Sequence, residues 1–384
     1  MLLSRLRRGQ KSSGDLHTVH KHIPEKKKMI SKKWLKPLLL CCTLLAPLAQ
    51  VQAQTLPNVV ILATGGTIAG TGATSTTTVG YTAAKIGVEA LIEAVPELKK
   101  VANVRGEQVF QIASENMNND YWLKLAKRIN VLLAQSDVDG IVVTHGTDTI
   151  EETAYFLNLV VKSRKPVVIV GAMRPSTAIS ADGPINLYNS VMLAGSPDAI
   201  GKGVLVAMND QINGAREVTK TNTSTLDTFK TPELGLLGYI QGSKPYFYRQ
   251  STRKHTADTE FDVSKLDVLP QVDIVYGYAN VNPIALNAFV AAGAKGIVHA
   301  GVGDGSLAST ETPALIEARK KGVIIVRASR VGQGIVARNG EADDDKLDFV
   351  VADTLNAQKA RILLMLELTR TTNTKEIQQA FYKY

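Results

Sequence analysis

The chain has 384 residues, of which 45% are hydrophobic and 21% are charged, a composition typical of a globular protein long enough for two domains. Its formal net charge of +9 arises in residues 1–53, which contain 11 of the 44 basic side chains and 2 of the 35 acidic ones. The rest of the chain carries 33 of each sign. Charge therefore gives no reason to expect a nucleic-acid or membrane partner for the body of the protein.

The N-terminal segment has the pattern of an export signal. A basic stretch begins at Met29, a short apolar stretch follows, and the small residues of VQA at 51–53 fit a cleavage site. The apolar stretch is too short for an ordinary membrane span. We expect translation to start at Met29 and cleavage to follow Ala53, the alternative for residues 1–28 being a genuine but disordered extension.

Apolar, β-branched runs alternate with helical patterns after Ala53. Continuous apolar runs without alternation are typical of parallel strands that are buried on both faces. Strands alternating with helices predict an α/β protein with mainly parallel sheets. The runs lie at 58–64, 140–146, 166–172, 203–208, 272–279, 296–301 and 323–329.

Two helical patterns are clear. Between the first runs, Leu125, Ile129, Leu132 and Leu133 fall on one helical face. Further on, the pattern of ALIEARKKG ends in Gly322, a plausible helix stop.

The same reading divides the chain into domains. Residues 56–241 form the larger N-terminal domain, residues 242–266 a connection without a long apolar run, and residues 267–384 the smaller C-terminal domain. The segment 71–82 is rich in Gly, Ser and Thr and predicts a mobile loop. Ligands of such sheets bind beyond the carboxyl ends of the strands, so the residues at those ends are the candidates for function.

The first polar cluster follows the first expected strand, in ILATGGTIAGTG. Gly65 and Gly66 allow a sharp turn that brings backbone N–H groups close to a ligand, and Thr67 stands at the turn. The alternative is a dinucleotide-binding turn or a simple tight loop. The G-x-G-x-x-G spacing of dinucleotide-binding turns is absent.

The second cluster is VVTHGTDTIEET. Thr147 and Asp148 follow an expected strand, and Thr149 with Glu152 has capping-box spacing, so a helix should begin there with its positive end toward the cavity. The alternative is that Asp148 is an ordinary acid at a helix start.

The third cluster, REVTKTNTSTLDTF, places Lys220 among hydroxyl side chains. By itself it could be a surface lysine. Together the three clusters suggest a threonine nucleophile, because a hydroxyl becomes reactive when a neighbouring base removes its proton. An aspartate would hold the lysine, and the lysine would take that proton.

Other chemistries find little support. Cys41 and Cys42 lie in the expected export signal, so the mature chain would have neither thiol catalysis nor a cysteine-ligated metal. We expect His145 and His299 to be packed near strand ends and His255 to be an exposed loop residue. No G-x-S-x-G motif is present, which argues against a Ser–His–Asp site. No H-E-x-x-H motif is present either, so we expect no metal.

The clusters resemble the motifs of a known family. ILATGGTIAG and VVTHGTDTIEETAYFL resemble the two signature motifs of bacterial L-asparaginases, and further matches cover nearly everything after Gln54. These run through VGAMRPSTAISADGPINLYNS, VLVAMNDQINGAREVTKTNTSTLDTFKT, RKHTADTEFDVSKL and LNAQKARILLMLELT. With the export signal, the resemblance is to the type II, periplasmic group. It implies hydrolysis of L-asparagine to L-aspartate and ammonia through an acyl-enzyme on threonine, without a cofactor or metal.

The resemblance also implies roles for individual residues. Thr67 corresponds to the nucleophile, Tyr81 to its mobile partner, and Thr147, Asp148 and Lys220 to a second hydroxyl with its acid and lysine. The substrate α-carboxylate would bind Ser114, and the α-ammonium would face Asp148 and Glu115. Backbone groups at Gly66, Thr147 and Ala172 would border the amide and its oxyanion. Glu341 corresponds to a glutamate that reaches Tyr81 from a neighbouring subunit, so the resemblance implies a homotetramer with sites at subunit interfaces.

Three departures from the asparagine-selective members resemble the glutaminase-asparaginase subgroup. Those members commonly have Gln in place of Glu115, Asn in place of Ser306, and a cysteine pair near Ser136 and Ser163. We therefore expect activity on both L-asparagine and L-glutamine. Left open are the base that activates Thr67, either Lys220 through Thr147 or Glu341 through Tyr81, and the alternative of a non-catalytic periplasmic amino-acid binding protein.

Overall fold

The structure, a computed structural model, describes residues 55–384, so the expected export signal and its cleavage point lie outside the described residues. The helices are α1 (Val88–Glu93), α2 (Asn119–Leu133), α3 (Ile150–Val160), α4 (Gly183–Ala194), α5 (Ile284–Ala291), α6 (Thr312–Lys320), α7 (Asp344–Leu347), α8 (Ala357–Glu367) and α9 (Thr374–Lys383). None of the helices within this range is long and apolar enough to cross a membrane.

The strands form three sheets. In chain order they are β1 (Asn58–Gly65), β2 (Asn103–Ile112), β3 (Gly140–Thr144), β4 (Val167–Val170), β5 (Val204–Met208), β6 (Gln211–Gly214), β7 (Thr219–Lys220), β8 (Phe229–Lys230), β9 (Gly238–Gln241), β10 (Lys244–Phe247), β11 (Val272–Tyr276), β12 (Gly296–Gly301), β13 (Ile324–Ser329) and β14 (Val350–Val351).

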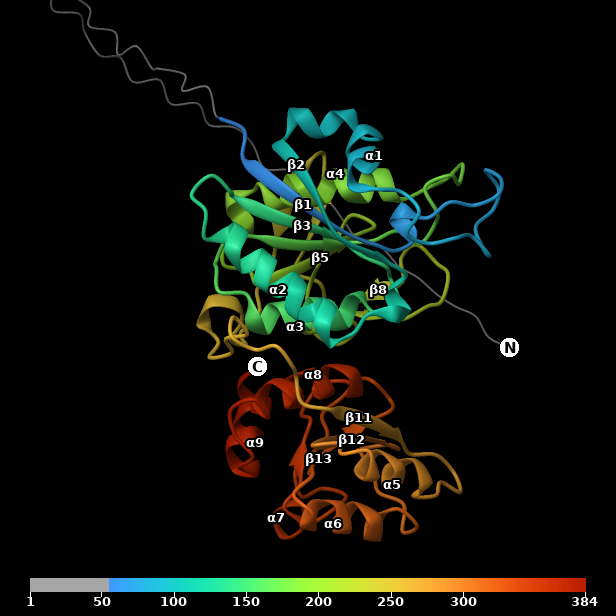
Figure 1. Cartoon of the computed structure of the whole chain (residues 1–384), viewed down its shortest axis with the longest axis vertical. Helices are drawn as coiled ribbons and strands as arrows, with labels where there is room; N and C mark the ends of the chain where they lie inside the picture. The colour runs from blue at the N-terminus through green and yellow to red at the C-terminus, as the bar shows by residue number, and fades with distance from the viewer. Residues whose placement is uncertain (1–54) are drawn as a thin grey trace, which may run out of the picture. The chain divides into compact units, whose positions relative to one another are not determined.

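The large sheet has eight strands in the order β10-β9-β6-β5-β4-β3-β1-β2. Strands β1 to β5 are mutually parallel, while β6, β9 and β10 add antiparallel pairs at the other end. Alternate residues of β1 enter different cores, Val60 and Leu62 on one face and Val59 and Ile61 on the other. Helices α2 and α3 cover the first face, and α1 and α4 cover the second (Figure 1).

The second sheet is smaller and entirely parallel, in the order β11-β12-β13-β14. Helices α8 and α9 pack on one face and α5 and α6 on the other (Figure 1). One hydrophobic cluster contains residues of α2 and α3 together with residues of α8 and α9, so the two sheets share a core. The α/β prediction with mainly parallel sheets is confirmed.

The observed elements agree with most of the expected ones. All seven predicted strands are present, and the predicted apolar face of α2 is buried. Strand β10, however, lies inside 242–266 and pairs with β9, so the large sheet extends into the expected connection. Its side chains alternate between exposed and half-buried positions, which leaves no apolar run to reveal it. The exact domain boundaries stay a prediction.

Candidate active site

The site lies at the carboxyl edge of the large sheet. Strands β1, β2, β3 and β4 are parallel and end at Gly65, Ile112, Thr144 and Val170, so the loops that follow them meet at one edge. From β1 the chain goes outward to β2 and then returns to the other side of β1 as β3. This reversal of strand order opens a crevice, which is where open α/β sheets bind ligands.

A cavity of about 630 Å³ occupies this position. Eight of the eleven predicted site residues line it, and they come from segments far apart in the sequence. They are Gly66, Thr67, Tyr81, Ser114, Glu115, Thr147, Asp148 and Lys220.

Thr67 begins a short 3₁₀ helix (Thr67–Ala69) directly after β1 and is 7% exposed. Its hydroxyl lies 2.7 Å from the hydroxyl of Tyr81, and either atom can be the donor. Tyr81 belongs to the loop that runs from 71 to 82, whose two ends are joined by a β-bridge between Thr71 and Thr82. The loop thereby brings a phenol to the hydroxyl of Thr67.

A second hydroxyl lies beside a lysine in the same cavity. Lys220 Nζ donates to Thr147 Oγ1 at 3.0 Å and to Asp148 Oδ1 at 2.6 Å. Thr147 is buried, whereas the Asp148 side chain remains 61% exposed, so its carboxylate is open to a ligand in the cavity. The lysine thus contacts both a second hydroxyl and an acid that holds the lysine in place.

Two glycines allow the strand ends to approach. Gly66 has a φ of +80°, and a Cβ there would lie 2.3 Å from the backbone nitrogen of Gly146. A Cβ on Gly146 would lie 2.5 Å from Ser114 Oγ. The loops after β1 and β3 therefore pack backbone against backbone, and the loop after β3 packs closely against the side chain of Ser114 in the loop after β2.

The start of α3 differs from the expected capping box. Thr149 is the N-cap, as predicted, but its side chain makes no capping hydrogen bond. Its hydroxyl instead donates to the carbonyl oxygen of Ser114 at 2.8 Å, and the backbone N–H of Asp148 faces Ser114 Oγ at 3.3 Å. The predicted Thr149–Glu152 capping box is therefore wrong, because the loop after β2 competes for the threonine hydroxyl.

His145 is fully buried beneath the site, as predicted. Its Nδ1 lies 2.8 Å from the carbonyl oxygen of Gly146, and its Nε2 lies 2.9 Å from Thr153 Oγ1. Thr153 Oγ1 accepts a hydrogen bond from Trp122 Nε1. Burial lowers the pKa of His145 to about 4, and the bond to Gly146 opposes this only partly. A neutral imidazole that donates from Nδ1 satisfies all of these contacts, so His145 supports the turn that precedes Thr147.

The other two histidines differ in burial. His299 is 1% exposed and lies 3.0 Å from Glu311 Oε2, which agrees with the prediction of a packed strand residue. His255 was expected to be exposed, but it is half-buried and precedes a 3₁₀ helix (Thr256–Asp258). Its ring packs near Gly203, which explains the difference.

Three predicted site residues do not line the cavity of this chain. Ala172 is fully buried after β4, although its neighbour Met173 does line the cavity. Ser306 lies in a tight turn closed by a bridge to Val302, and Glu341 is exposed on the second sheet's side of the chain.

Several cavity residues lie outside the predicted set, among them Arg174. The backbone N–H groups of Met173 and Arg174 donate to Asp182 at 3.0 and 2.9 Å, which fixes the turn after β4. Thr223 and Ser224 also line the cavity from the loop between β7 and β8. In the sequence, Thr223 and Ser224 could be found only by their proximity to Lys220, and Arg174 only by its proximity to the end of β4.

The cavity therefore holds two buried threonine hydroxyls with different partners, together with two acids, a lysine and an arginine. Such a set suits covalent catalysis on a small polar substrate with charged groups at one end. Over residues 55–384, no cluster of three or more His, Cys, Asp or Glu side chains is arranged to bind a metal ion.

Family comparisons agree along almost the whole described chain. Residues 58–253 match the family described as "Asparaginase, N-terminal", and residues 271–381 match "Glutaminase/Asparaginase C-terminal domain". L-asparaginase 2 of Bacillus subtilis is 59% identical over 333 residues, which cover 87% of this chain and 88% of that protein. Glutaminase-asparaginase of Pseudomonas fluorescens is 55% identical over 349 residues, which cover 90% and 96%.

A solved structure is similar as well. The crystal structure of a probable cytoplasmic L-asparaginase from Campylobacter jejuni superposes with a TM-score of 0.83 at 51% identity, and the match covers 85% of this chain and all of the other. At this level of identity the likeness extends to sequence as well as fold.

Proposed function

The chain belongs to the glutaminase/asparaginase family, and from that premise we propose that it hydrolyses the side-chain amide of L-asparagine, and also that of L-glutamine, through a threonyl ester on Thr67. The observation that carries this proposal is the meeting of Thr67–Tyr81 and Thr147–Asp148–Lys220 around one cavity. A protein that only bound amino acids would need a fitting cavity but not two threonine hydroxyls that are each hydrogen-bonded to a group able to transfer a proton.

The reaction has two steps. In the first, Thr67 Oγ1 bonds to the amide carbon, the C–N bond breaks, and the threonine proton leaves with the nitrogen as ammonia. In the second, water attacks the ester, releases the product carboxylate and returns a proton to Thr67. Tyr81 lies 2.7 Å from the nucleophile, and Lys220 lies 3.0 Å from Thr147, so both hydroxyls have a group through which a proton can move.

The charged groups of the cavity suit the ends of an amino acid. The exposed carboxylate of Asp148 and the nearby Glu115 suit an α-ammonium, and the hydroxyl of Ser114 suits an α-carboxylate. The N–H of Gly66 already donates to the carbonyl oxygen of Ile112 at 3.0 Å, so the backbone N–H of Thr147, just before α3, is the group that can stabilise the developing oxyanion.

The dual specificity rests on Glu115 and Ser306. Glu115 adds negative charge at the ammonium end, and Ser306 is a short side chain that would leave room at an interface. Asparagine and glutamine differ by one methylene, which a pocket discriminates by about 1–3 kcal/mol. Small changes in the lining therefore suffice to admit both substrates.

Export and assembly complete the proposal. The basic, apolar and small-residue pattern that ends at Ala53 supports export to the periplasm. The similar Campylobacter protein is described as cytoplasmic, so the location rests on this N-terminal pattern alone. The exposed position of Glu341 supports a homotetramer in which it completes a neighbour's site.

The proposal is tested by ammonia release from purified protein beginning at Gln54, with L-asparagine and then L-glutamine as substrate. We expect kcat/KM values within about tenfold of each other, and we expect Thr67→Ala to abolish ammonia release from both. A matched Thr71→Ala variant, which removes a hydroxyl outside the cavity lining, should retain activity.

Other outcomes separate the parts of the proposal. Activity on asparagine without detectable glutamine turnover would contradict the dual specificity and leave the asparaginase assignment standing. A Thr67→Ala variant that still released ammonia at the wild-type rate would contradict the threonyl ester.

A further inference from the structure

Lys220 stands on a strand that has little support of its own. Strand β7 consists of Thr219 and Lys220 alone, and it pairs only with the two-residue β8 outside the large sheet. A short two-stranded ribbon is marginally stable in water. The position of the lysine must therefore be fixed by other groups.

Glu151 provides one such group. It lies in the first turn of α3 and is 6% exposed. Its Oε1 accepts hydrogen bonds from Thr219 Oγ1 at 3.1 Å and from the backbone N–H of Lys220 at 3.3 Å. Because Lys220 Nζ contacts Asp148 just before the same helix, the start of α3 holds both the backbone and the tip of this lysine.

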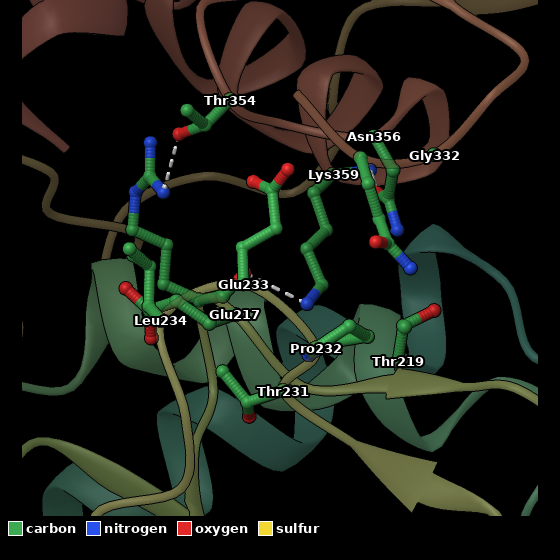
Figure 2. Close-up of a pocket in the computed structure, with 12 residues that line it drawn as sticks. Glu217, Thr219, Thr231, Pro232, Glu233, Leu234, Gly332, Thr354, Asn356 and Lys359 are labelled. Carbon is green, nitrogen blue, oxygen red and sulfur yellow. Dashed lines mark hydrogen bonds between the residues drawn. The ribbon is translucent and has the colours of Figure 1, made fainter. Parts of the chain in front are cut away.

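The second sheet's helix α8 provides the other groups. Asn356, the N-cap of α8, donates from Nδ2 to Glu151 Oε2 at 3.0 Å. Lys359 Nζ donates to the carbonyl oxygen of Arg216 at 2.8 Å and to that of Val218, and it lies 3.9 Å from Glu151 Oε2. Figure 2 shows Lys359 extending from this part of the chain toward the segment that carries Thr219.

The charge of Lys359 is costly in this position. The side chain is 1% exposed, and burial lowers its pKa to about 8, with the carboxylate of Glu151 opposing the shift. Glu217 and Glu152 also favour its charged form, while Arg216 disfavours it. A buried ammonium is tolerated only when it is paired and hydrogen-bonded, and here its bonds go to the backbone that leads into Lys220.

We propose that Glu151, Asn356 and Lys359 are positioning residues that hold Lys220 at hydrogen-bond distance from Thr147 and Asp148. The second sheet thereby fixes the geometry of a catalytic group that belongs to the first. This inference rests on the proposed function, since it assigns the network a role in the same reaction.

An exchange of donor and acceptor tests the network. In Glu151→Gln, the new NH₂ group either faces the NH₂ group of Asn356 or takes the place of the oxygen that accepts from Lys220 N–H. In Asn356→Asp, two carboxylates face each other. The double variant restores the hydrogen bond with its direction reversed, keeps the total charge, and retains a side chain that can cap α8.

We expect each single variant to lower kcat about tenfold or more with KM within about twofold, because the loss falls on the reaction steps. The double variant should recover most of the wild-type kcat, which a purely additive pair of defects would not do. Glu367→Gln is the matched control, because it makes the same substitution at a buried glutamate of α8 that lies outside the network. Glu367 pairs with Arg370. The kcat of this variant should equal that of wild type.

Each outcome decides between alternatives. The network would be overturned by a wild-type kcat in Glu151→Gln, or by a double variant whose loss of kcat equals the product of the two single losses. In either case, amidase activity of the wild type would still uphold the proposed function. A wild-type protein without amidase activity would overturn both. If the single variants do not fold, Thr219→Val takes their place, since it removes one donor to Glu151: a lowered kcat with unchanged KM supports the network, and an unchanged kcat contradicts it.

Discussion

At the scale of single residues, chemistry in this cavity depends on which partner each side chain meets. Thr67 and Thr147 are both buried threonines that follow a strand, yet one meets a phenol and the other an ammonium. The sequence motifs indicated both threonines, because each follows an apolar run. They did not reveal Glu151, whose partner Asn356 is 205 positions away in the chain.

His145 gives a residue-scale prediction about pH. Its pKa is about 4 in the folded protein and 6.5 ordinarily, so the unfolded chain binds more protons between these values. Stability contributed by the neutral ring is fully present above pH 6.5 and is lost as the pH falls toward 4. Across the full range the difference amounts to about 3 kcal/mol, of which about 2 kcal/mol falls between about pH 7 and about pH 4.5. Urea unfolding of wild type and His145→Gln at about pH 7 and about pH 4.5 measures it.

The comparison between the two proteins matters because carboxylates also titrate in this range. We expect the wild type to lose more free energy of unfolding than His145→Gln on going to the lower pH, even if the variant is less stable at neutral pH. Equal losses in the two proteins would show that the buried ring does not titrate as its surroundings indicate.

At the scale of elements, long apolar runs identified the strands that are buried on both faces, and these strands position the site. Strands such as β2 and β9 escaped because they lack such runs: β9 alternates buried and exposed residues, and most of β2 is exposed or half-buried. Strand β7 escaped because it has two residues. Contacts between distant segments, such as Thr149 with Ser114, replaced the local capping that the sequence pattern predicted.

At this scale we predict the effect of replacing Gly66 by alanine. An alanine there would have to keep a φ of +80° with its Cβ 2.3 Å from Gly146. Backbone strain of this kind costs about 1–3 kcal/mol, and the contact adds to it by pushing the loops after β1 and β3 apart. We expect Gly66→Ala to lower the melting temperature and to weaken substrate binding.

Gly201 supplies the matched control. Its φ is +72°, but nothing lies within 4 Å of the position its Cβ would take. Gly201→Ala therefore shares the backbone strain without the contact, and its substrate KM should not change. If the two variants have the same effect on stability and on KM, the close approach of Gly66 to Gly146 does not shape the site.

At the scale of the whole molecule, the two sheets act as one structure. Residues of α2, α3, α8 and α9 share a core, and Arg216 near β7 donates to the carbonyl oxygen of Tyr384 at 2.7 Å. Yet the site described in one chain lacks Glu341 and Ser306, two residues that the family resemblance places in it. Our proposal of a site completed by a neighbouring subunit predicts this absence.

Mixing two inactive variants tests that arrangement. Thr67→Ala removes the nucleophile, and Glu341→Ala removes the group that we expect to act on a neighbour's site. If subunits pair at random, half of the pairs contain one chain of each kind, and each such pair has one complete site, since the Thr67→Ala chain still supplies Glu341 to its partner. Unfolding and refolding the two variants together should therefore restore about a quarter of wild-type kcat per chain, whereas each variant refolded alone should stay inactive. Should the mixture remain as inactive as its components while forming oligomers of the same mass, Glu341 would act, if at all, within its own chain.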